Sequence, residues 1–390
     1  MQLYRRTLAL PGIRTLLVLV FFARIPATAS GMVLTLHIAV TMDRGYGAAG
    51  TVGAVATVGI ALGAPLLGRV VDRFGLRPML VITTIGEAMF WLFARFMPFE
   101  MLLVCGFVGG LLVLPAMSIG RQAIAALVPE DLRRTAYSMD SVSTELSFMV
   151  GPAAAVFVAT QFSTQTATLA MAAGIVVVGA ALFVVNPAVR SEAEKADTEK
   201  VPRRVWLTPR LAGVLLVGAG AVFILAGTEV AIVAQMEHNG DLSWTGVVMV
   251  VWSAASAVGG IVYGAMKRSV PQVTLMAGLA LLTIPIGLAG GSWWVLMLAI
   301  VPAACLCAPT IASTGEEVAR LAPAAARGEA TGLQSSAFTL GSAVGAPLVG
   351  FVVDHGSPSW GFGVAGVGGV LVAGLAWVLA ARQREPAPVS

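Results

Sequence analysis

The sequence predicts an all-α membrane protein whose twelve transmembrane helices form two pseudo-symmetric six-helix bundles. Three observations predict this fold: an apolar composition, twelve apolar runs of membrane-spanning length, and a repeat of half the chain. Of the 390 residues, 57% are hydrophobic and 11% are charged, whereas soluble domains carry about 25% charged residues. Such a chain has too few charges to cover a surface in water, so we expect the lipid bilayer to be its solvent.

The remaining composition supports a membrane protein without a metal or cofactor. The 44 glycines and 20 prolines fit membrane helices, in which both residues are commoner than in soluble helices. The cysteines all lie in apolar runs and are interpreted as packing residues, and the scattered histidines show no metal-ligand spacing. These residues are Cys105, Cys305, Cys307, His37, His238 and His355.

Each apolar run is close to the roughly 20 residues that a helix needs to cross a hydrocarbon core of about 30 Å. Arg5, Arg6 and the apolar run after them could form a secretory signal. Arg24 interrupts that run, and apolar character continues to Val40, which favours an uncleaved first span. The alternating segments of a membrane β-barrel are absent from the sequence. The predicted spans are 14–40, 46–68, 78–97, 100–126, 135–160, 166–186, 209–235, 243–264, 271–290, 292–313, 328–353 and 360–381.

The positive charges give the orientation. Of 24 Lys and Arg residues, only Arg44 and Arg95 fall in segments that the span order places outside, and Arg24 falls within a span. Because positive residues stay cytoplasmic, we expect a multi-pass protein of the cytoplasmic (inner) membrane with both termini inside. The predicted organisation is an N-terminal bundle at 1–189, a cytoplasmic linker at 190–208 and a C-terminal bundle at 209–390.

The two halves of the chain resemble each other at a constant offset of 194 residues, which indicates two six-helix bundles in parallel repeat. Many secondary transporters are built from such repeats, with the substrate site at the midplane between them. Chance matches in a composition rich in Gly, Ala and Pro are the alternative explanation. The matched pairs are Pro115/Pro309, Pro129/Pro323, Arg133/Arg327, Ala136/Ala330, Ser141/Ser335 and Gly151/Gly345.

A charged loop between the second and third spans carries the most specific motif. Its sequence GRVVDRFGLRPML runs from Gly68 to Leu80 and has the form G-x-x-x-D-R-x-G-x-R. It resembles the cytoplasmic loop signature of the major facilitator superfamily, at the place where that family has it. The resemblance, of a bacterial, exporter-like kind, covers the twelve-span chain and implies a secondary transporter. The matching positions are Gly68, Asp72, Arg73, Gly75 and Arg77.

The resemblance implies that this loop is a conformational latch between the two halves. Glycines permit a tight turn, and a carboxylate near a helix N-terminus is stabilised by about 0.3–1 kcal/mol. In the family, Asp72 would approach span eleven, which begins here near Arg327. Leu76 departs from the pattern, because the family usually has a basic residue there, and this puts part of the charge network in doubt.

A second resemblance points towards export. Gly151 and Pro152 in span five match the family's antiporter signature, although its flanking glycines are Ser147 and Ala155 here. Generic helix packing also explains a Gly-Pro pair. Exporters of the family often carry an arginine early in span four, and Cys105 stands at that place, which weakens the case for the usual route of proton antiport.

Ionisable residues inside spans need an explanation, because each costs about 2.5–3.5 kcal/mol at the bilayer centre. Arg24 and Glu145 lie at a similar depth of about 15 Å, from the helical rise. We therefore expect them to pair, to face the central cavity, and to bind substrate or couple a proton. The alternative is a static ion pair within the first half.

Two further carboxylates are candidates. Glu229 lies about 30 Å along span seven, which lines the cavity in the family, so it is either a gate or proton-coupling group or a wetted helix end. Glu87, near the middle of span three, is the alternative partner of Arg24. Glu316 and Glu317 are expected to be surface or latch groups, and Trp293 and Trp294 to lie at the outer interface.

The predicted function is a secondary active exporter of small hydrophobic or amphipathic molecules, proton-coupled and working by alternating access. Few Asn or Gln side chains lie in the spans, which disfavours sugars. The alternatives are an uptake symporter for a metabolite and a non-transporting membrane receptor. The expected partners are a small-molecule substrate, a proton or other coupling ion and the lipid bilayer. We expect a monomer, no nucleic acid, no catalytic site and no enzyme activity, and we expect no ATP use because a G-x-x-x-x-G-K-[ST] loop is absent.

Overall fold

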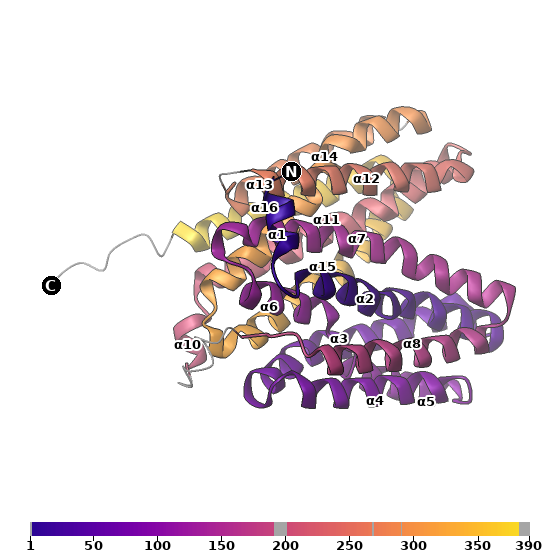
Figure 1. Cartoon of the computed structure of the whole chain (residues 1–390). Helices are drawn as coiled ribbons and strands as arrows, with labels where there is room; N and C mark the ends of the chain where they lie inside the picture. The colour runs from indigo at the N-terminus through magenta and orange to yellow at the C-terminus, as the bar shows by residue number, and fades with distance from the viewer. Residues whose placement is uncertain (1, 191–200, 267–268, 290, 382–390) are drawn as a thin grey trace.

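The computed structural model describes residues 2–190, 201–266, 269–289 and 291–381, and within these ranges all regular structure is helical. Long helices run side by side across the molecule, with α1 and α10 at one end (Figure 1). The elements of residues 2–185 are α1 (Gln2–Ala9), α2 (Ile13–Leu36), η1 (His37–Thr41), α3 (Gly45–Phe74), α4 (Leu76–Ala94), α5 (Phe99–Leu111), α6 (Ala116–Leu127), α7 (Glu130–Gln161) and α8 (Thr164–Val185).

The remaining elements are α10 (Arg203–Trp206), α11 (Pro209–His238), η2 (Leu242–Trp244), α12 (Thr245–Ala265), α13 (Gln272–Thr283), η3 (Ile284–Ala289), α14 (Trp293–Leu321), η4 (Ala324–Ala326), α15 (Arg327–His355) and α16 (Pro358–Ala381). We call α2–α8 the first half and α11–α16 the second half. The end of the molecule where α3 meets α4 is the motif end.

The described part of the chain contains twelve segments long and apolar enough to cross a membrane. This confirms the predicted all-helical, twelve-span fold, and the predicted spans correspond to these segments one by one. The predicted linker 190–208 lies partly outside the described residues. Span four differs from a simple helix, because it consists of α5 and α6 with a break at residues 112–115. Proline lacks the backbone N–H that would continue the helix, and Pro115 caps the second piece.

Local sequence explains several helix boundaries. Pro129 precedes α7, whose first turn contains Glu130 and Asp131; proline and acidic residues both suit a helix start. The Thr208 hydroxyl caps α11 by accepting the backbone N–H of Leu211 at 3.3 Å. Gly75 turns the chain between α3 and α4 with φ of 86°, a left-handed conformation that glycine adopts without steric penalty.

The helix contacts repeat between the two halves. In the first half, α2 packs on α7, α3 on α5 and α4 on α8; in the second, α11 packs on α15, α12 on α14 and α13 on α16. Gly151 lies against Thr28 of α2, and its repeat partner Gly345 lies against Phe223 of α11. Small residues let membrane helices approach closely. The matched glycines therefore permit the same close helix contact in each half, which supports the internal repeat.

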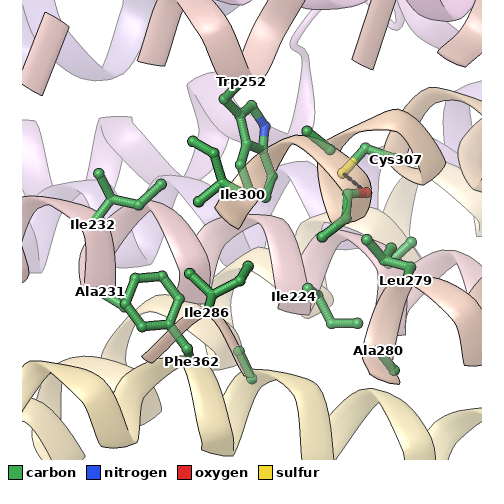
Figure 2. Packing of buried hydrophobic residues seen from close by; sticks show 14 of the residues in the cluster. Ile224, Ala231, Ile232, Trp252, Leu279, Ala280, Ile286, Ile300, Cys307 and Phe362 are labelled. Atoms are coloured by element: carbon green, nitrogen blue, oxygen red, sulfur yellow. Dashed lines mark hydrogen bonds between the residues drawn. The ribbon is translucent and has the colours of Figure 1, made fainter. Parts of the chain in front are cut away.

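A large apolar cluster fills the second half (Figure 2). It joins Ile224 and Ile232 of α11 to Trp252 of α12, Ile300 of α14 and Phe362 of α16. Because lipid tails are as apolar as these side chains, burial here stabilises the bundle through van der Waals packing rather than by removing apolar area from water.

The two halves touch along the part of the molecule nearest the motif end. On α15, one face repeats every four residues: Gly328 meets Gly68, Gly332 meets Ala64, and the Ser336 hydroxyl donates to the Ala61 carbonyl at 2.5 Å.

Ala343 lies on this face two turns beyond Ser336, because seven residues return a helix to within about 20° of the same direction. Ala343 is exposed, as is the neighbouring Leu340, whose fractional exposure is 56%. Since this face is covered up to Ser336 and open beyond it, α3 and α15 part there. At 1.5 Å per residue, Ser336 lies about 14 Å from the start of α15, near the middle of a membrane.

Candidate functional site: a latch between halves and a charged centre

Asp72 binds the start of α15. Its Oδ1 accepts the backbone N–H of Gly328 at 2.9 Å, and its Oδ2 accepts that of Glu329 at 2.8 Å. The first backbone N–H groups of a helix have no partner within the helix, and the helix dipole favours a negative charge there. Asp72 therefore caps a helix of the other half, as the resemblance implied for a latch near Arg327.

Basic side chains surround this cap. Glu329 forms ion pairs with Arg69 at 3.1 Å and with Arg203, which precedes the second half. Arg190 lies 3.6 Å from the Asp72 carboxylate and donates to the Asp72 carbonyl at 2.7 Å. The latch therefore ties the first half, the segments before the second half, and α15 together.

The other motif residues have separate tasks. Gly68 lies so close to the Gly328 carbonyl that a Cβ would collide with it, so this glycine permits the contact between α3 and α15. Arg77 covers the Phe183 ring at 5.2 Å, and Arg73 lies 5.0 Å from the Phe74 ring. Leu76 is buried in an apolar cluster of the first half, where a basic side chain would lack a partner.

A second contact between the halves lies at the same end. The Thr135 hydroxyl donates to the Gly264 carbonyl at 2.6 Å, and Arg134 pairs with Glu316 at 3.4 Å. The Tyr4 hydroxyl donates to the Ile261 carbonyl at 2.6 Å. Burial raises the pKa of Tyr4 to about 12, so this hydroxyl stays a donor at physiological pH. Side chains of two elements of the first part of the chain, α1 and α7, thus hold α12 and α14.

The predicted pair of Arg24 and Glu145 is wrong. Arg24 is 1% exposed and binds Asp140 instead, with Nη2 at 2.6 Å from Oδ1 and Nη1 donating to the Asp140 carbonyl at 3.3 Å. Asp140 and Glu145 are five residues apart on α7, so they point to different faces of the helix. Arg121 of α6 also approaches Asp140, at 3.9 Å. The structure therefore holds a charged centre of Arg24, Arg121 and Asp140.

Glu145 faces the second half. Its carboxylate accepts a hydrogen bond from the Ser256 hydroxyl of α12, and the Ser256 oxygen in turn accepts the Ala308 backbone N–H of α14 at 3.2 Å. The other carboxylate oxygen, Oε2, is buried without a hydrogen-bond partner. Glu145 therefore joins the halves through a single neutral partner.

Glu87 does not bind Arg24 either, which corrects its expected role as the alternative partner. Its Oε2 accepts the backbone N–H of Leu114 at 2.8 Å, inside the break between α5 and α6. It also lines a cavity of about 10 Å³ with Ala23, Pro26 and Ile175, near the lower limit for one water. A broken membrane helix needs a partner for each freed backbone group, and Glu87 supplies one.

Nearly all of the chain matches a family model described as Major Facilitator Superfamily, over residues 16–271 and 230–390. The chain belongs to the major facilitator superfamily. Its members are transporters, so this chain is a membrane transporter and not an enzyme. A search of curated proteins gave no match.

Solved structures of superfamily members share the fold. A human organic anion transporter has a TM-score of 0.73 at 17% identity, with 94% of this chain and 100% of that chain covered. A proton:xylose symporter has a TM-score of 0.71 at 15% identity, with 94% and 95% covered. A bacterial homologue of the iron transporter ferroportin, in an outward-facing state, has 0.73 at 13% identity, with 96% and 99% covered.

Two remaining superfamily predictions stay open. Glu229 of α11 is exposed, and it lies close enough to Cys307 of α14 for an electrostatic interaction; this position fits both a gate and a wetted group. Gly151 has a packing reason, because a Cβ there would collide with the Thr28 hydroxyl. Pro152 follows it within α7, so an antiporter role for the pair stays a prediction.

Sequence reasoning missed Asp140, Arg121, Ser256 and Glu329. Asp140 lies inside the predicted span 135–160, so counting every charge in that span would have found it. Arg121 lies near the end of the predicted span 100–126, where a basic residue is ordinary and gives no signal of a buried site. Ser256 carries no signal, because an uncharged serine in a membrane span is ordinary; only the tertiary contact with Glu145 reveals it.

Proposed function

We propose that this chain is a secondary active transporter that exports small hydrophobic or amphipathic molecules across the cytoplasmic membrane by alternating access. In this mechanism the two halves open to one side of the membrane at a time. We further propose that export is coupled to protons. Residues 1–189 and 209–390 are the two bundles that rock against each other, and residues 190–208 are the linker between them.

The observation that carries the proposal is the one-ended contact between the halves. Asp72 and Thr135 join the halves at the motif end, whereas the same face of α15 is exposed at Ala343, two turns beyond Ser336. Such a geometry is one of the two states that alternating access requires. Hydrogen bonds, ion pairs and the packing of small residues make these contacts, so they can break and re-form without unfolding either bundle.

The charge distribution supports an orientation with the motif end in the cytoplasm. Arg69, Arg73, Arg77, Arg203 and Arg204 all lie at or beside that end, and positive residues of membrane proteins remain on the cytoplasmic side. On this orientation, both described ends of the chain are cytoplasmic, and the structure is closed inside and open outside.

Glu145 is the proposed coupling group. It sits between the halves, binds Ser256 and has one buried oxygen without a partner. Protonation removes the charge from this carboxylate and changes its contact with the second half. A carboxylate in this position can therefore link a proton to the movement of the halves.

Flux in proteoliposomes tests the proposal. We expect a pH gradient, acidic on the side opposite the motif end, to drive amphipathic dyes away from the motif end. Dyes accumulated in the opposite direction would show uptake and overturn the export assignment. Binding without flux under any gradient would instead indicate a receptor.

The variant Glu145→Gln tests the coupling. Gln keeps the size of the side chain and a hydrogen bond to Ser256 but cannot exchange a proton, so we expect gradient-driven flux to fall to background while folding is kept. The matched control is Glu130→Gln, at the exposed start of α7. Full gradient-driven flux in Glu145→Gln would remove this residue from the mechanism.

A further inference from the structure

The charged centre carries one uncompensated positive charge. Arg24 and Arg121 supply two positive charges, and Asp140 supplies one negative charge. The groups that interact electrostatically with Arg121 are Asp140 on α7, Arg24 on α2 and the Tyr137 hydroxyl on α7. All three side chains of the centre are at least 97% buried. Buried ionised groups ordinarily occur in balanced pairs, so the surplus requires an explanation.

The surplus belongs to Arg121. Asp140 gives Arg24 a contact at 2.6 Å, whereas its distance to Arg121 is 3.9 Å. The Nη1 of Arg121 is buried without a hydrogen-bond partner, although a guanidinium offers five donors. The Tyr137 hydroxyl donates to the Arg121 backbone carbonyl at 3.1 Å and so fixes the backbone rather than the charge. Arg121 thus retains an unused donor and an incompletely balanced charge.

Arg121 also faces the second half, where the halves part. The Phe338 ring of α15 lies 4.7 Å from the Arg121 guanidinium carbon. Phe338 follows Ser336, the last covered residue on the α15 face, by two positions. On α6, one turn before Arg121, the hydroxyl of Ser118 meets that of Thr331 across the halves at 2.8 Å. Arg121 is therefore covered in this state by side chains that move away when the motif end opens.

We propose that Arg121 binds the carboxylate of an amphipathic organic anion, with Arg24 and Asp140 holding the guanidinium in place. The carboxylate balances the surplus charge and accepts from Nη1, and the Phe338 ring packs on the apolar part of the molecule. Guanidinium–carboxylate hydrogen bonds are among the stronger ones in proteins. This inference rests on the proposed transport function and names its substrate class. Loading occurs from the motif end, where the site is now closed.

A matched pair of probes tests the site: a dansyl-labelled undecanoic acid and its methyl ester, which lacks the negative charge and carries one added methyl group. Binding to the purified full chain is measured by dansyl fluorescence. We expect the acid to bind about tenfold or more tightly than the ester, and Arg121→Gln to reduce that preference to about twofold or less. Arg121→Lys keeps the positive charge but loses the paired N–H donors of the guanidinium, so its preference for the acid should lie between those of the natural chain and of Arg121→Gln. The matched control is Arg44→Gln, an exposed arginine 5.5 Å from the Phe99 ring.

The closed position of the site gives a second readout. Asp72→Asn weakens the latch, so it should raise the apparent affinity for the acid several-fold while Arg121 is present, and not in the Asp72→Asn/Arg121→Gln double variant. Equal binding of acid and ester by the natural chain, no binding of the acid, or an unchanged preference in folded Arg121→Gln would each overturn the inference. Flux of both probes without preference refutes the anion site alone, whereas preferential binding without flux refutes transport alone.

Discussion

Breaking the latch at Asp72 should open the motif end by a calculable amount. In Asp72→Asn, one of the two backbone N–H groups of α15 loses its acceptor, because an amide has a single oxygen. A buried donor left unpaired costs about 1–3 kcal/mol, and the lost interaction with the helix N-terminus costs about 0.3–1 kcal/mol. The lower part of the combined range, about 1.4–2.8 kcal/mol, corresponds to a shift of roughly ten- to a hundredfold towards the open motif end.

Cysteine labelling can measure this shift. Ser138 is fully buried against Gly264, between α7 and α12, and its hydroxyl has no hydrogen-bond partner, so Ser138→Cys is a mild reporter. In a background with Cys105, Cys305 and Cys307 changed to Ala, we expect a maleimide to label this reporter about ten- to a hundredfold faster when Asp72→Asn is added.

The control for this experiment is Asp354→Asn, an exposed aspartate at the other end of α15, which should leave the rate unchanged. If Asp72→Asn labels within about twofold of its parent, then the two hydrogen bonds to Gly328 and Glu329 do not hold the motif end closed. The reasoning from helix capping would then be refuted.

Two predictions concern stability, and thermal unfolding in detergent checks both. Asp140→Asn leaves Arg24 and Arg121 without a counter-charge and should destabilise the protein by about 3–5 kcal/mol; adding Arg121→Gln should restore part of this, and equal stability of the single variant and the natural chain would contradict the charged centre. Glu87→Ala removes the acceptor of the Leu114 N–H and should lower stability by about 1–3 kcal/mol, whereas Glu87→Gln keeps an acceptor and should keep both stability and transport. Loss of transport in a stable Glu87→Gln would show that Glu87 works as a titrating group.

The latch could be predicted from the sequence because its parts are adjacent in the chain or follow a family pattern. Asp72 and the turn at Gly75 form one continuous motif, and the start of span eleven follows from the span count. Leu76 shows the limit of the pattern: its departure raised doubt about the charge network, yet Arg69 and Arg190 supply that network from other positions. A basic side chain at one helix end can thus replace one at another, so the residue at any single position does not reveal whether the charge network is present.

The charged centre could not be predicted correctly, because depth alone does not fix direction. Arg24 and Glu145 lie at similar depths, but successive helix residues rotate by about 100°, and Asp140 rather than Glu145 points at Arg24. Glu87 likewise found a backbone donor that exists only because span four breaks before Pro115. A charge inside a span signals that a partner is present, and the packing of the helices selects which one.

The amino-acid sequence alone determined the membrane location, the twelve spans, the half-chain repeat and the latch motif. The first three follow from local composition and spacing, since lipid requires each span to satisfy its own backbone hydrogen bonds, and the latch motif follows from the resemblance of its loop to the family signature. Only the tertiary structure decided which charges meet, that Glu145 reaches Ser256 in the other half, and that α3 and α15 part beyond Ser336. Those features depend on the rotation and tilt of each helix against its neighbours, and side-chain packing between helices sets both.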